Sequence, residues 1–316
     1  MSLSKEREGR SKTPTGRYDP ASPLPCQPTW AVPPATLTES SPTPSFDPVL
    51  ADDFATAISE FLGEKREVVR RRLDMDFANL GCLIAAEWEK RNPDTEQEIA
   101  SFYKETDTYI ISLATDHCLV RRRDVVGPLY QRVSRFGTKS RVLVWGDGIG
   151  TESIAFAKMG HEVDYFDLPG RTSEFAAFRF NREGLAPRIR VVDDPQKLKF
   201  GGYDIVVCVE VLEHLKDPLA VMRSFYDLLR PRGIALITES FASVGPEFPS
   251  HLPENAKYAG CTHQLMESFG FASTWFNHEP INYPMEFKKV GWGMGGRVLR
   301  ARGALRRAFL SRLRRK

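Results

Sequence analysis

The sequence predicts an α/β fold, in which a mostly parallel sheet carries helices on both faces and follows an all-helical region. A short apolar run, residues 142–145, leads into three alternating glycines, Gly146, Gly148 and Gly150. A segment with helical periodicity comes next, and then a second apolar run that ends at Asp167. Further apolar runs alternate with helical segments downstream, which is typical of parallel strands joined by crossover helices.

Composition and charge favour a globular protein without a nucleic-acid-binding core. The chain has 316 residues and a formal net charge of +3. Nine Lys and Arg residues and no acidic residue occupy the last twenty positions, so the remainder carries a net charge of −6. No apolar run has transmembrane length, and no secretory signal is recognisable. The five cysteines show no metal-ligand spacing, so we expect a reduced, cytoplasmic compartment and no bound metal.

Two regions precede the α/β part. Residues 1–46 are rich in Pro, Ser and Thr and bury too little apolar surface to offset the entropy of ordering, so we expect disorder. Residues 47–137 carry apolar stripes at helical spacing and predict five helices, the fourth running from Thr95 to Leu113. We expect this region to act as a lid over a substrate. Its aromatic residues are predicted to pack in the core instead of lining a pocket: Phe102, Tyr103, Tyr109 and Tyr130.

The α/β part, residues 138–290, opens with a nucleotide-binding pattern. The glycine turn precedes a helix over 151–159, and the N-terminus of that helix can receive an anionic group. Asp167 follows the second strand, where a carboxylate can accept both hydroxyl protons of a ribose. The dinucleotide fingerprint G-x-G-x-x-G fits only in part, because its third glycine is replaced by Thr151.

Apolar runs predict three further strands and a C-terminal pair that includes an antiparallel edge, over 189–192, 203–209, 234–238 and within 272–289. Acidic residues stand where the strands end. Asp193 and Asp194 follow the third strand, and Glu210 follows the fourth.

The segment after the fourth strand makes the pattern specific. Glu210-Val-Leu-Glu-His-Leu215, Asp217-Pro218 and the later Arg230-Pro-Arg-Gly233 resemble the corresponding block of class I S-adenosylmethionine (SAM)-dependent methyltransferases. Within that superfamily the chain is most similar to the ubiquinone/menaquinone-biosynthesis type and its small-molecule relatives. The resemblance covers about residues 138–275. It implies a seven-stranded Rossmann-like sheet with the last strand antiparallel, and SAM as the cofactor.

The resemblance also implies roles for individual residues. Gly146, Gly148 and Gly150 would wrap the methionine part of SAM, and Asp167 would hold the ribose hydroxyls. Glu210 would lie beside the methionyl group and the reacting sulfonium.

The resemblance leaves undecided which residues make two of the cofactor contacts. Either Asp193 or Asp194 would meet the adenine amino group. The family usually has an acid two residues before the first glycine, and this chain has Val144 there. Asp147, between the first two glycines, is expected to contact the SAM ammonium instead.

Methyl transfer from a sulfonium is an in-line displacement that mainly needs alignment, so no fixed catalytic constellation is required. A base helps if the acceptor must lose a proton, and the candidates are His214, His251 and His263. The alternative for each is an ordinary structural histidine.

We therefore expect a SAM-dependent methyltransferase that acts on a small molecule held between the α/β domain and the N-terminal helices. Secondary-metabolite, quinone and lipid biosynthesis would suit it. The alternatives are an NAD-type oxidoreductase using the same turn and a catalytically inactive methyltransferase-like scaffold. Residues 291–316 form a basic amphipathic tail, for which a solvated helix is favoured over contact with an anionic membrane surface. No nucleic acid partner is expected.

Overall fold

The computed structural model describes residues 45–93, 95–245, 248–276, 284–291 and 293–313, and it confirms the predicted α/β fold class. The tail expected to be disordered, residues 1–46, lies outside the described residues except for its last two. Among the helices that are described, none is both long and apolar enough to cross a membrane.

The strands of the described chain form one seven-stranded sheet in the order β3-β2-β1-β4-β5-β7-β6. The first five strands are parallel, and β7 is antiparallel to both of its neighbours, β5 and β6. This confirms the sheet that the family resemblance implied. The strands are β1 (Arg141–Trp145), β2 (Glu162–Phe166), β3 (Ile189–Val192), β4 (Tyr203–Val209), β5 (Leu229–Thr238), β6 (Phe271–Phe276) and β7 (Met285–Lys289).

Each face of the sheet packs against its own set of helices, because successive strand residues point to opposite faces. Val142 and Val144 belong to the apolar cluster on one face, and Leu143 belongs to the cluster on the other. Strand β4 is buried on both sides, as its almost wholly apolar sequence predicts. The first face is covered by α6 (Val120–Ser134), α7 (Thr151–Lys158) and α8 (Arg171–Arg182), and the second by α9 (Pro218–Leu228) and α10 (Thr262–Ser268).

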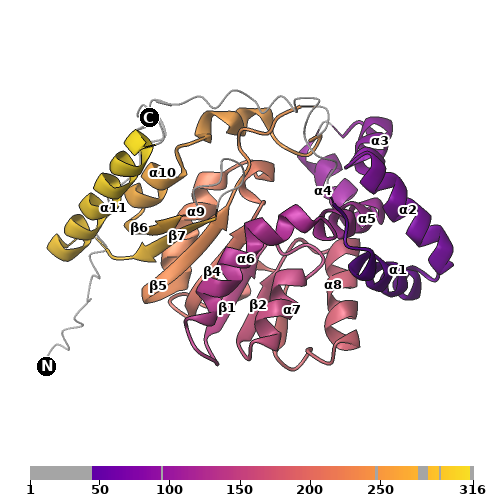
Figure 1. The fold of residues 1–316 in the computed structure, drawn as a ribbon, viewed down its shortest axis with the longest axis horizontal. Coiled ribbons are helices and arrows are strands. Elements are labelled where there is room, and N and C mark those ends of the chain that lie inside the picture. The colour runs from indigo at the N-terminus through magenta and orange to yellow at the C-terminus, as the bar shows by residue number, and fades with distance from the viewer. Residues whose placement is uncertain (1–44, 94, 246–247, 277–283, 292, 314–316) are drawn as a thin grey trace, which may run out of the picture.

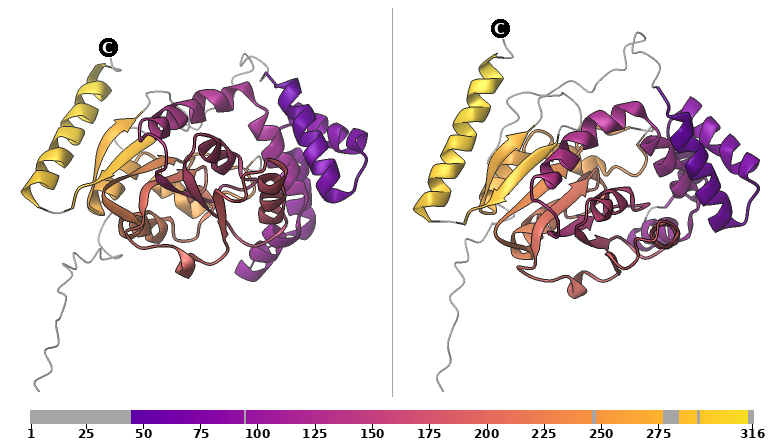
Figure 2. Two further views of the ribbon diagram at one scale, coloured as in Figure 1. Left: turned by 90° about the horizontal axis from the view of Figure 1, so that it is seen from below. Right: turned by 60° about the horizontal axis from the view of Figure 1, so that its bottom comes forward.

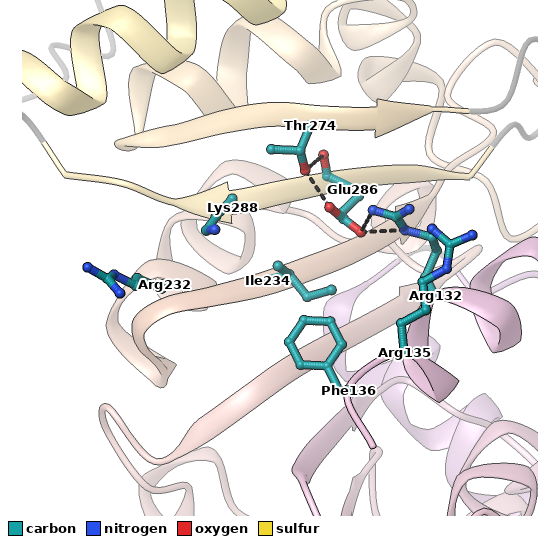
Figure 3. Close-up of a pocket in the computed structure, with 8 residues that line it drawn as sticks. All are labelled: Arg132, Arg135, Phe136, Arg232, Ile234, Thr274, Glu286 and Lys288. Carbon is teal, nitrogen blue, oxygen red and sulfur yellow. Dashed lines mark hydrogen bonds and ion pairs between the residues drawn. The ribbon is translucent and has the colours of Figure 1, made fainter. Parts of the chain in front are cut away.

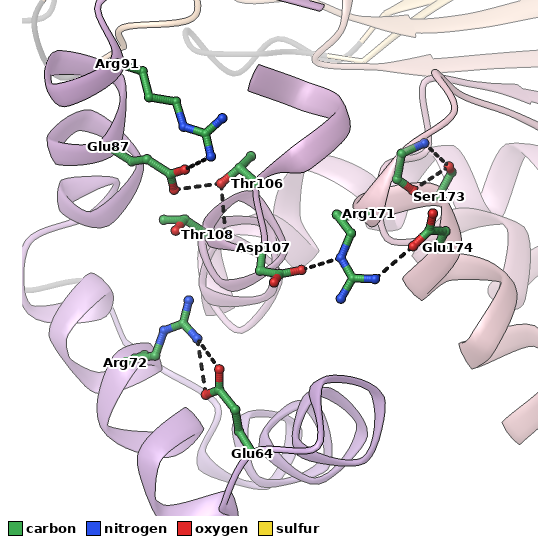
Figure 4. Close-up of polar contacts among 11 residues, drawn as sticks. Glu64, Arg72, Glu87, Arg91, Thr106, Asp107, Thr108, Arg171, Ser173 and Glu174 are labelled. Carbon is green, nitrogen blue, oxygen red and sulfur yellow. Dashed lines mark hydrogen bonds and ion pairs between the residues drawn. The ribbon is translucent and has the colours of Figure 1, made fainter. Parts of the chain in front are cut away.

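Five helices before α6 gather at one end of the molecule (Figure 1). Three of them, α1, α2 and α5, bury an apolar cluster together with Ile149 and Phe175 of the sheet domain. The prediction of a single helix from Thr95 to Leu113 is wrong, because the chain turns at Thr106. The hydroxyl of Thr106 accepts the N–H of Thr108 at 3.1 Å and donates to Glu87 at 2.7 Å (Figure 4). The helices are α1 (Pro48–Leu62), α2 (Arg66–Ala78), α3 (Cys82–Arg91), α4 (Glu96–Glu105) and α5 (Thr108–His117).

The corner between α4 and α5 rests against the start of α8. Asp107 accepts from Arg171 at 2.7 Å (Figure 4). The Arg171 guanidinium also lies 4.7 Å from the ring centre of Phe61. The backbones also approach closely, since a Cβ on Gly170 would lie 2.6 Å from the Cα of Lys104. The helical region is therefore fixed to the sheet domain by contact as well as by the chain.

The C-terminal helix α11 (Met294–Leu313) lies along β6, at the end of the molecule opposite α1–α5 (Figures 1 and 2). Gly303 faces the strand, because a Cβ there would lie 2.8 Å from the carbonyl oxygen of Ser273. Arg307 forms two hydrogen bonds with Glu267, at 2.7 and 2.9 Å. The predicted apolar side points outward, with Leu305 71% exposed.

Replacing Gly150 by Ala should destabilise the protein more than the matched change Gly184→Ala. Both glycines have a positive φ, +79° and +67°, which costs an Ala about 1–2 kcal/mol. Only at Gly150 does the added Cβ meet a buried neighbour, the ring of Phe180 at 2.5 Å, so we expect about 1–3 kcal/mol more there. Urea unfolding measures both free energies, and equal losses would contradict this packing.

Candidate active site

The glycine turn between β1 and α7 packs against three other parts of the chain: the segment after β4, helix α5 and helix α8. Gly146, Gly148 and Gly150 have φ values of +71°, +54° and +79°, a region that glycine adopts readily. A Cβ on Gly146 would lie 2.5 Å from Val211, which follows β4, and one on Gly148 would lie 2.8 Å from Leu113 of α5. The turn thus needs glycines for its backbone conformation and for the approach of its neighbours.

Asp167 stands at the end of β2 and faces this turn. Its two carboxylate oxygens accept the N–H groups of Gly148 at 2.6 Å and of Leu168 at 2.7 Å. Burial raises the pKa of Asp167 to about 6. Within the described residues, no Arg or Lys forms an ion pair with this carboxylate. Its remaining lone pairs can therefore accept two hydroxyl protons, so the residue fits the ribose contact expected of it.

Asp147 makes hydrogen bonds that the sequence does not predict. Its carboxylate oxygens accept the backbone N–H groups of Glu152 at 3.1 Å and Ser153 at 2.7 Å, in the first turn of α7. Asp147 is 6% exposed, and burial raises its pKa well above the usual range. The geometry assigns it to capping the helix, and the expected contact with the SAM ammonium stays a prediction.

Asp193 and Asp194 both follow β3, and both have protein partners. Asp193 is exposed and pairs with Lys197 at 2.5 Å. Asp194 is half-buried and accepts the N–H of Gln196 at 2.8 Å. The choice of adenine contact therefore stays a prediction with two candidates.

The segment after β4 brings two glutamates to the same edge of the sheet. Glu210 adopts a φ of +52°, which is unfavourable for a residue with a side chain, and its N–H donates to the hydroxyl of Thr238 at 3.1 Å. Glu213 is 1% exposed and accepts from Ser240 at 2.6 Å. Burial raises the pKa of both, that of Glu213 to about 7, and their like charges add to the shift for Glu210.

His214 and His251 come together beside these glutamates. Their ring centres are 4.6 Å apart and the rings are perpendicular, at 89°. The Nδ1 atoms lie 3.0 Å from the Ser250 carbonyl oxygen and 2.6 Å from that of Ser243, respectively. A carbonyl oxygen only accepts, so each Nδ1 carries the proton and each Nε2 keeps a lone pair. Burial lowers both pKa values, that of His251 to about 4, so both rings are neutral at pH 7.

His263, the third candidate base, lies elsewhere. It is 5% exposed on α10, its Nδ1 is 3.1 Å from the Ser273 hydroxyl, and its ring centre is 5.4 Å from that of Phe287. Burial lowers its pKa to about 3. His263 thus packs between α10 and the strands β6 and β7, and its catalytic role stays a prediction.

Two tyrosines from the helical region complete the site, although the sequence favoured packing for them. Tyr103 of α4 and Tyr109 of α5 have ring centres 5.3 Å apart, and both interact with the side chain of Ser250. Burial raises the pKa of Tyr103 to about 12, and the charges of Asp167 and Glu213 add to the shift. These tyrosines therefore cover the edge where the two carboxylates lie. Phe102 and Tyr130 pack as predicted, against Trp88 and Phe156.

A separate surface groove of about 370 Å³ lies at the other edge of the sheet (Figure 3). Arg232 and Ile234 from the first part of β5 line it, whereas the candidate site lies beyond the end of β5 at Thr238. Arg132 from α6 forms an ion pair with Glu286 of β7 across it, at 2.5 Å. The groove is lined by Arg132, Arg135, Phe136, Arg232, Ile234, Thr274, Glu286 and Lys288.

A Rossmann-like sheet whose glycine turn and strand-end carboxylate meet at one edge defines a nucleotide-binding α/β protein. Residues 120–283, about half of the chain, match the family described as a methyltransferase domain. The chain therefore belongs to this methyltransferase family. The match confirms the resemblance to class I SAM-dependent methyltransferases and disfavours an NAD-type oxidoreductase.

Curated relatives with similar sequences are ubiquinone biosynthesis O-methyltransferases. That of Xanthomonas campestris pv. campestris (strain B100) is 32% identical over 123 residues, which cover 36% of this chain and 52% of the relative. That of Histophilus somni (strain 2336) is 35% identical over 103 residues, covering 31% and 43%. The chain spans about half the length of the curated relatives it matches.

Solved structures with a similar fold include the 1,6-didemethyltoxoflavin-N1-methyltransferase of Burkholderia thailandensis, with its substrate and S-adenosylhomocysteine bound. Its TM-score is 0.41 at 22% identity, over 52% of this chain and 77% of that one. A SAM-dependent methyltransferase from Aquifex aeolicus has a TM-score of 0.42 at 17% identity, over 54% and 96%.

Asp147→Ala should lower the free energy of unfolding by about 1–2 kcal/mol, the usual effect of losing a helix cap. It should leave the affinity for S-adenosylhomocysteine (SAH) within a few-fold, because the carboxylate is turned to α7. Asp47→Ala, at the cap of α1, is the matched control for cap loss. A large loss of SAH affinity with no loss of stability would instead indicate that Asp147 contacts the ammonium group of the cofactor.

Proposed function

We propose that this protein transfers a methyl group from SAM to a hydroxyl oxygen of a small-molecule acceptor. The methyltransferase family supports the reaction. The observation that carries the proposal is the convergence of the glycine turn, Asp167 and the pair His214 and His251 under Tyr103 of the helical region. The names of the curated relatives support oxygen as the acceptor atom.

The cofactor end of the proposed site consists of the turn and the acids after β2 and β3. The glycine turn would hold the methionine part of SAM, Asp167 would accept the ribose hydroxyl protons, and Asp193 or Asp194 would meet the adenine. When bound, SAM supplies a methyl group on a positively charged sulfur, already activated for displacement. The buried carboxylate of Glu210 would lie beside that charge.

The acceptor end lies between the loops after β4 and β5 and the helices α4 and α5. The rings of Tyr103 and Tyr109 suit an aromatic acceptor, and the Nε2 lone pairs of His214 and His251 suit its hydroxyl group. The tyrosines also exclude water from the reacting atoms. In the transfer, the acceptor oxygen bonds to the methyl carbon, the sulfur keeps the electron pair of the broken bond, and the hydroxyl proton passes to the Nε2 atom of His214 or His251.

Cofactor binding is the first test, by calorimetric titration of the purified protein with SAM, SAH and NAD(H). We expect the two adenosyl ligands to bind and NAD(H) not to bind. Asp167 must be ionised to accept two protons, and its pKa is about 6. Affinity for SAH should therefore be constant above pH 7 and fall by up to about tenfold per pH unit below pH 6.

Asp167→Asn is the control for this pH dependence. The substitution removes the negative charge and one hydrogen-bond acceptor, so SAH binding should weaken by about 10–100-fold. The affinity of the variant should also no longer fall below pH 6. Unchanged binding by this variant would refute the site assignment. Binding of neither SAM nor SAH by the native chain would refute the proposed reaction.

We further propose that the protein works in the cytoplasm and that α11 rests on the anionic inner surface of a membrane. The outward side of this helix carries Val298 and Leu305, 52% and 71% exposed, among arginines. Glycines on the opposite side face the protein. Exposed apolar residues flanked by cations are typical of helices that lie in the membrane interface. An acceptor of low water solubility would suit this position.

Co-sedimentation with vesicles tests the membrane contact. The protein should bind vesicles that contain an anionic phospholipid and bind purely zwitterionic vesicles weakly. Leu305→Asp should reduce binding at least about tenfold, because it removes an apolar side chain worth about 1.5–3 kcal/mol when buried. Val49→Asp is the matched control, since Val49 is 77% exposed and lies on α1, at the end of the molecule opposite α11. Equal effects of the two variants would contradict the proposal.

A further inference from the structure

Three side chains at the acceptor end of the site have the composition and spacing of a metal-binding group. Glu213, His214 and His251 each offer a donor atom, and these atoms all lie within 4.8 Å of one another. The first two belong to the short helix after β4, and His251 belongs to the loop after β5. The loops are joined at this point, because Leu252 and Asn255 both donate hydrogen bonds to the carbonyl oxygen of Glu213, at 3.1 and 3.0 Å.

Both histidines are oriented as metal ligands usually are. The Nδ1–H of His214 donates to a backbone carbonyl at 3.0 Å, and that of His251 donates to another at 2.6 Å. Such a bond fixes the tautomer and the ring orientation, and it leaves the Nε2 lone pair directed away from the backbone. The two rings are perpendicular and their centres are 4.6 Å apart, so they pack against one another. The hydrogen bonds from Nδ1 fix the opposite side of each ring.

Glu213 supplies the negative charge. Its side chain is 1% exposed, and its Oε1 accepts from the Ser240 hydroxyl at 2.6 Å and lies 4.0 Å from the His214 Nε2. The second oxygen, Oε2, has no hydrogen-bond partner within the part of the chain that the structure describes. A buried carboxylate with an unsatisfied oxygen is costly unless a cation or a donor meets it.

We propose that Glu213, His214 and His251 bind one divalent transition-metal ion, through a carboxylate oxygen and the two Nε2 atoms. Two imidazoles and one carboxylate favour Zn²⁺, Fe²⁺ or Co²⁺ over Mg²⁺, which prefers oxygen ligands. Bonds of about 2.0–2.2 Å would place the donors about 3–3.5 Å apart, so the group needs only small side-chain rotations to close. Three protein ligands leave coordination positions open.

The metal site adds to the proposed function. Binding of the ion is independent of that function, and only the role of the ion in methyl transfer rests on it. A hydroxyl oxygen of the acceptor would coordinate at an open position, beside Tyr103 and Tyr109, which both interact with Ser250. A cation lowers the pKa of a bound hydroxyl, so the proton can leave to solvent before or during methyl transfer. The histidines then act as ligands instead of bases. The sequence predicts no metal, because Cys spacing does not signal this group and the loops meet only in the fold.

Metal binding by the full chain tests the proposal without an activity assay. The purified protein is stripped with a chelator, dialysed and titrated calorimetrically with Zn²⁺, Co²⁺ and Mg²⁺ under reducing conditions. We expect one Zn²⁺ per chain, with Mg²⁺ binding far more weakly. His251→Gln should weaken Zn²⁺ binding more than about tenfold, since losing even an outer partner of a ligand costs 10–100-fold.

His161→Gln is the matched control. His161 is buried at the start of β2, away from the ligand group, so its replacement should leave Zn²⁺ binding unchanged. Circular dichroism establishes that both variants are folded, and His214→Gln takes the place of His251→Gln if the latter does not fold. Absence of stoichiometric Zn²⁺ binding, or equal affinities of the native chain and a folded His251→Gln, would overturn the proposal.

SAH titrations on the same samples separate the two proposals. Zn²⁺ binding without SAH binding would leave the metal site standing and refute the methyltransferase reaction. SAH binding without Zn²⁺ binding would overturn the metal site and leave the reaction standing.

Discussion

The left-handed turn from Gly146 to Gly150 is the constraint on which the rest of the site depends. Positive φ values at three alternate residues bring the backbone so close to its neighbours that Val211, Leu113 and Phe180 occupy the places of missing side chains. The segment after β4, helix α5 and helix α8 therefore meet at one point. The helical region is positioned over the end of the sheet by the same turn that would receive the cofactor.

Burial of acidic groups at this edge is the second organising feature. Asp167 and Glu213 have pKa values raised to about 6 and about 7 by burial, and neither is neutralised by an ion pair with Arg or Lys among the described residues. Maintaining such groups costs folding free energy, so their retention favours a function that uses them. Ribose hydroxyls for Asp167 and a cation for Glu213 would both lower that cost. The tyrosines above the edge strengthen these interactions by excluding water.

The pattern of apolar residues and glycines in the sequence predicted most strands of the sheet and the glycine turn. Strands β1 and β4 are apolar runs because both faces of the sheet are covered, and the turn needs glycines that are visible in the sequence. Asp167 was predicted from its place at a strand end and Glu210 from the family resemblance, and the parallel sheet brings both to one edge. The break between α4 and α5 was missed, because it depends on a hydrogen bond from Thr106 to a distant residue, Glu87.

At the acceptor end of the site, the sequence predicted individual candidate residues but not which of them lie together. His214 and His251 were both candidates, but their pairing depends on how the loops after β4 and β5 pack. His263 was indistinguishable from them in sequence, although it is buried against Ser273 in the core. The tyrosines of α4 and α5 have the same helical spacing as core residues, so only the packing of the two regions reveals their position.

A crystal structure of the protein with SAH tests the central claim most directly. The account predicts that the ribose hydroxyls bind Asp167, that the methionine part follows the glycine turn, and that the sulfur faces the space between Tyr103 and His251. A ligand bound with its sulfur turned away from that space, or at a place remote from Asp167, would contradict it.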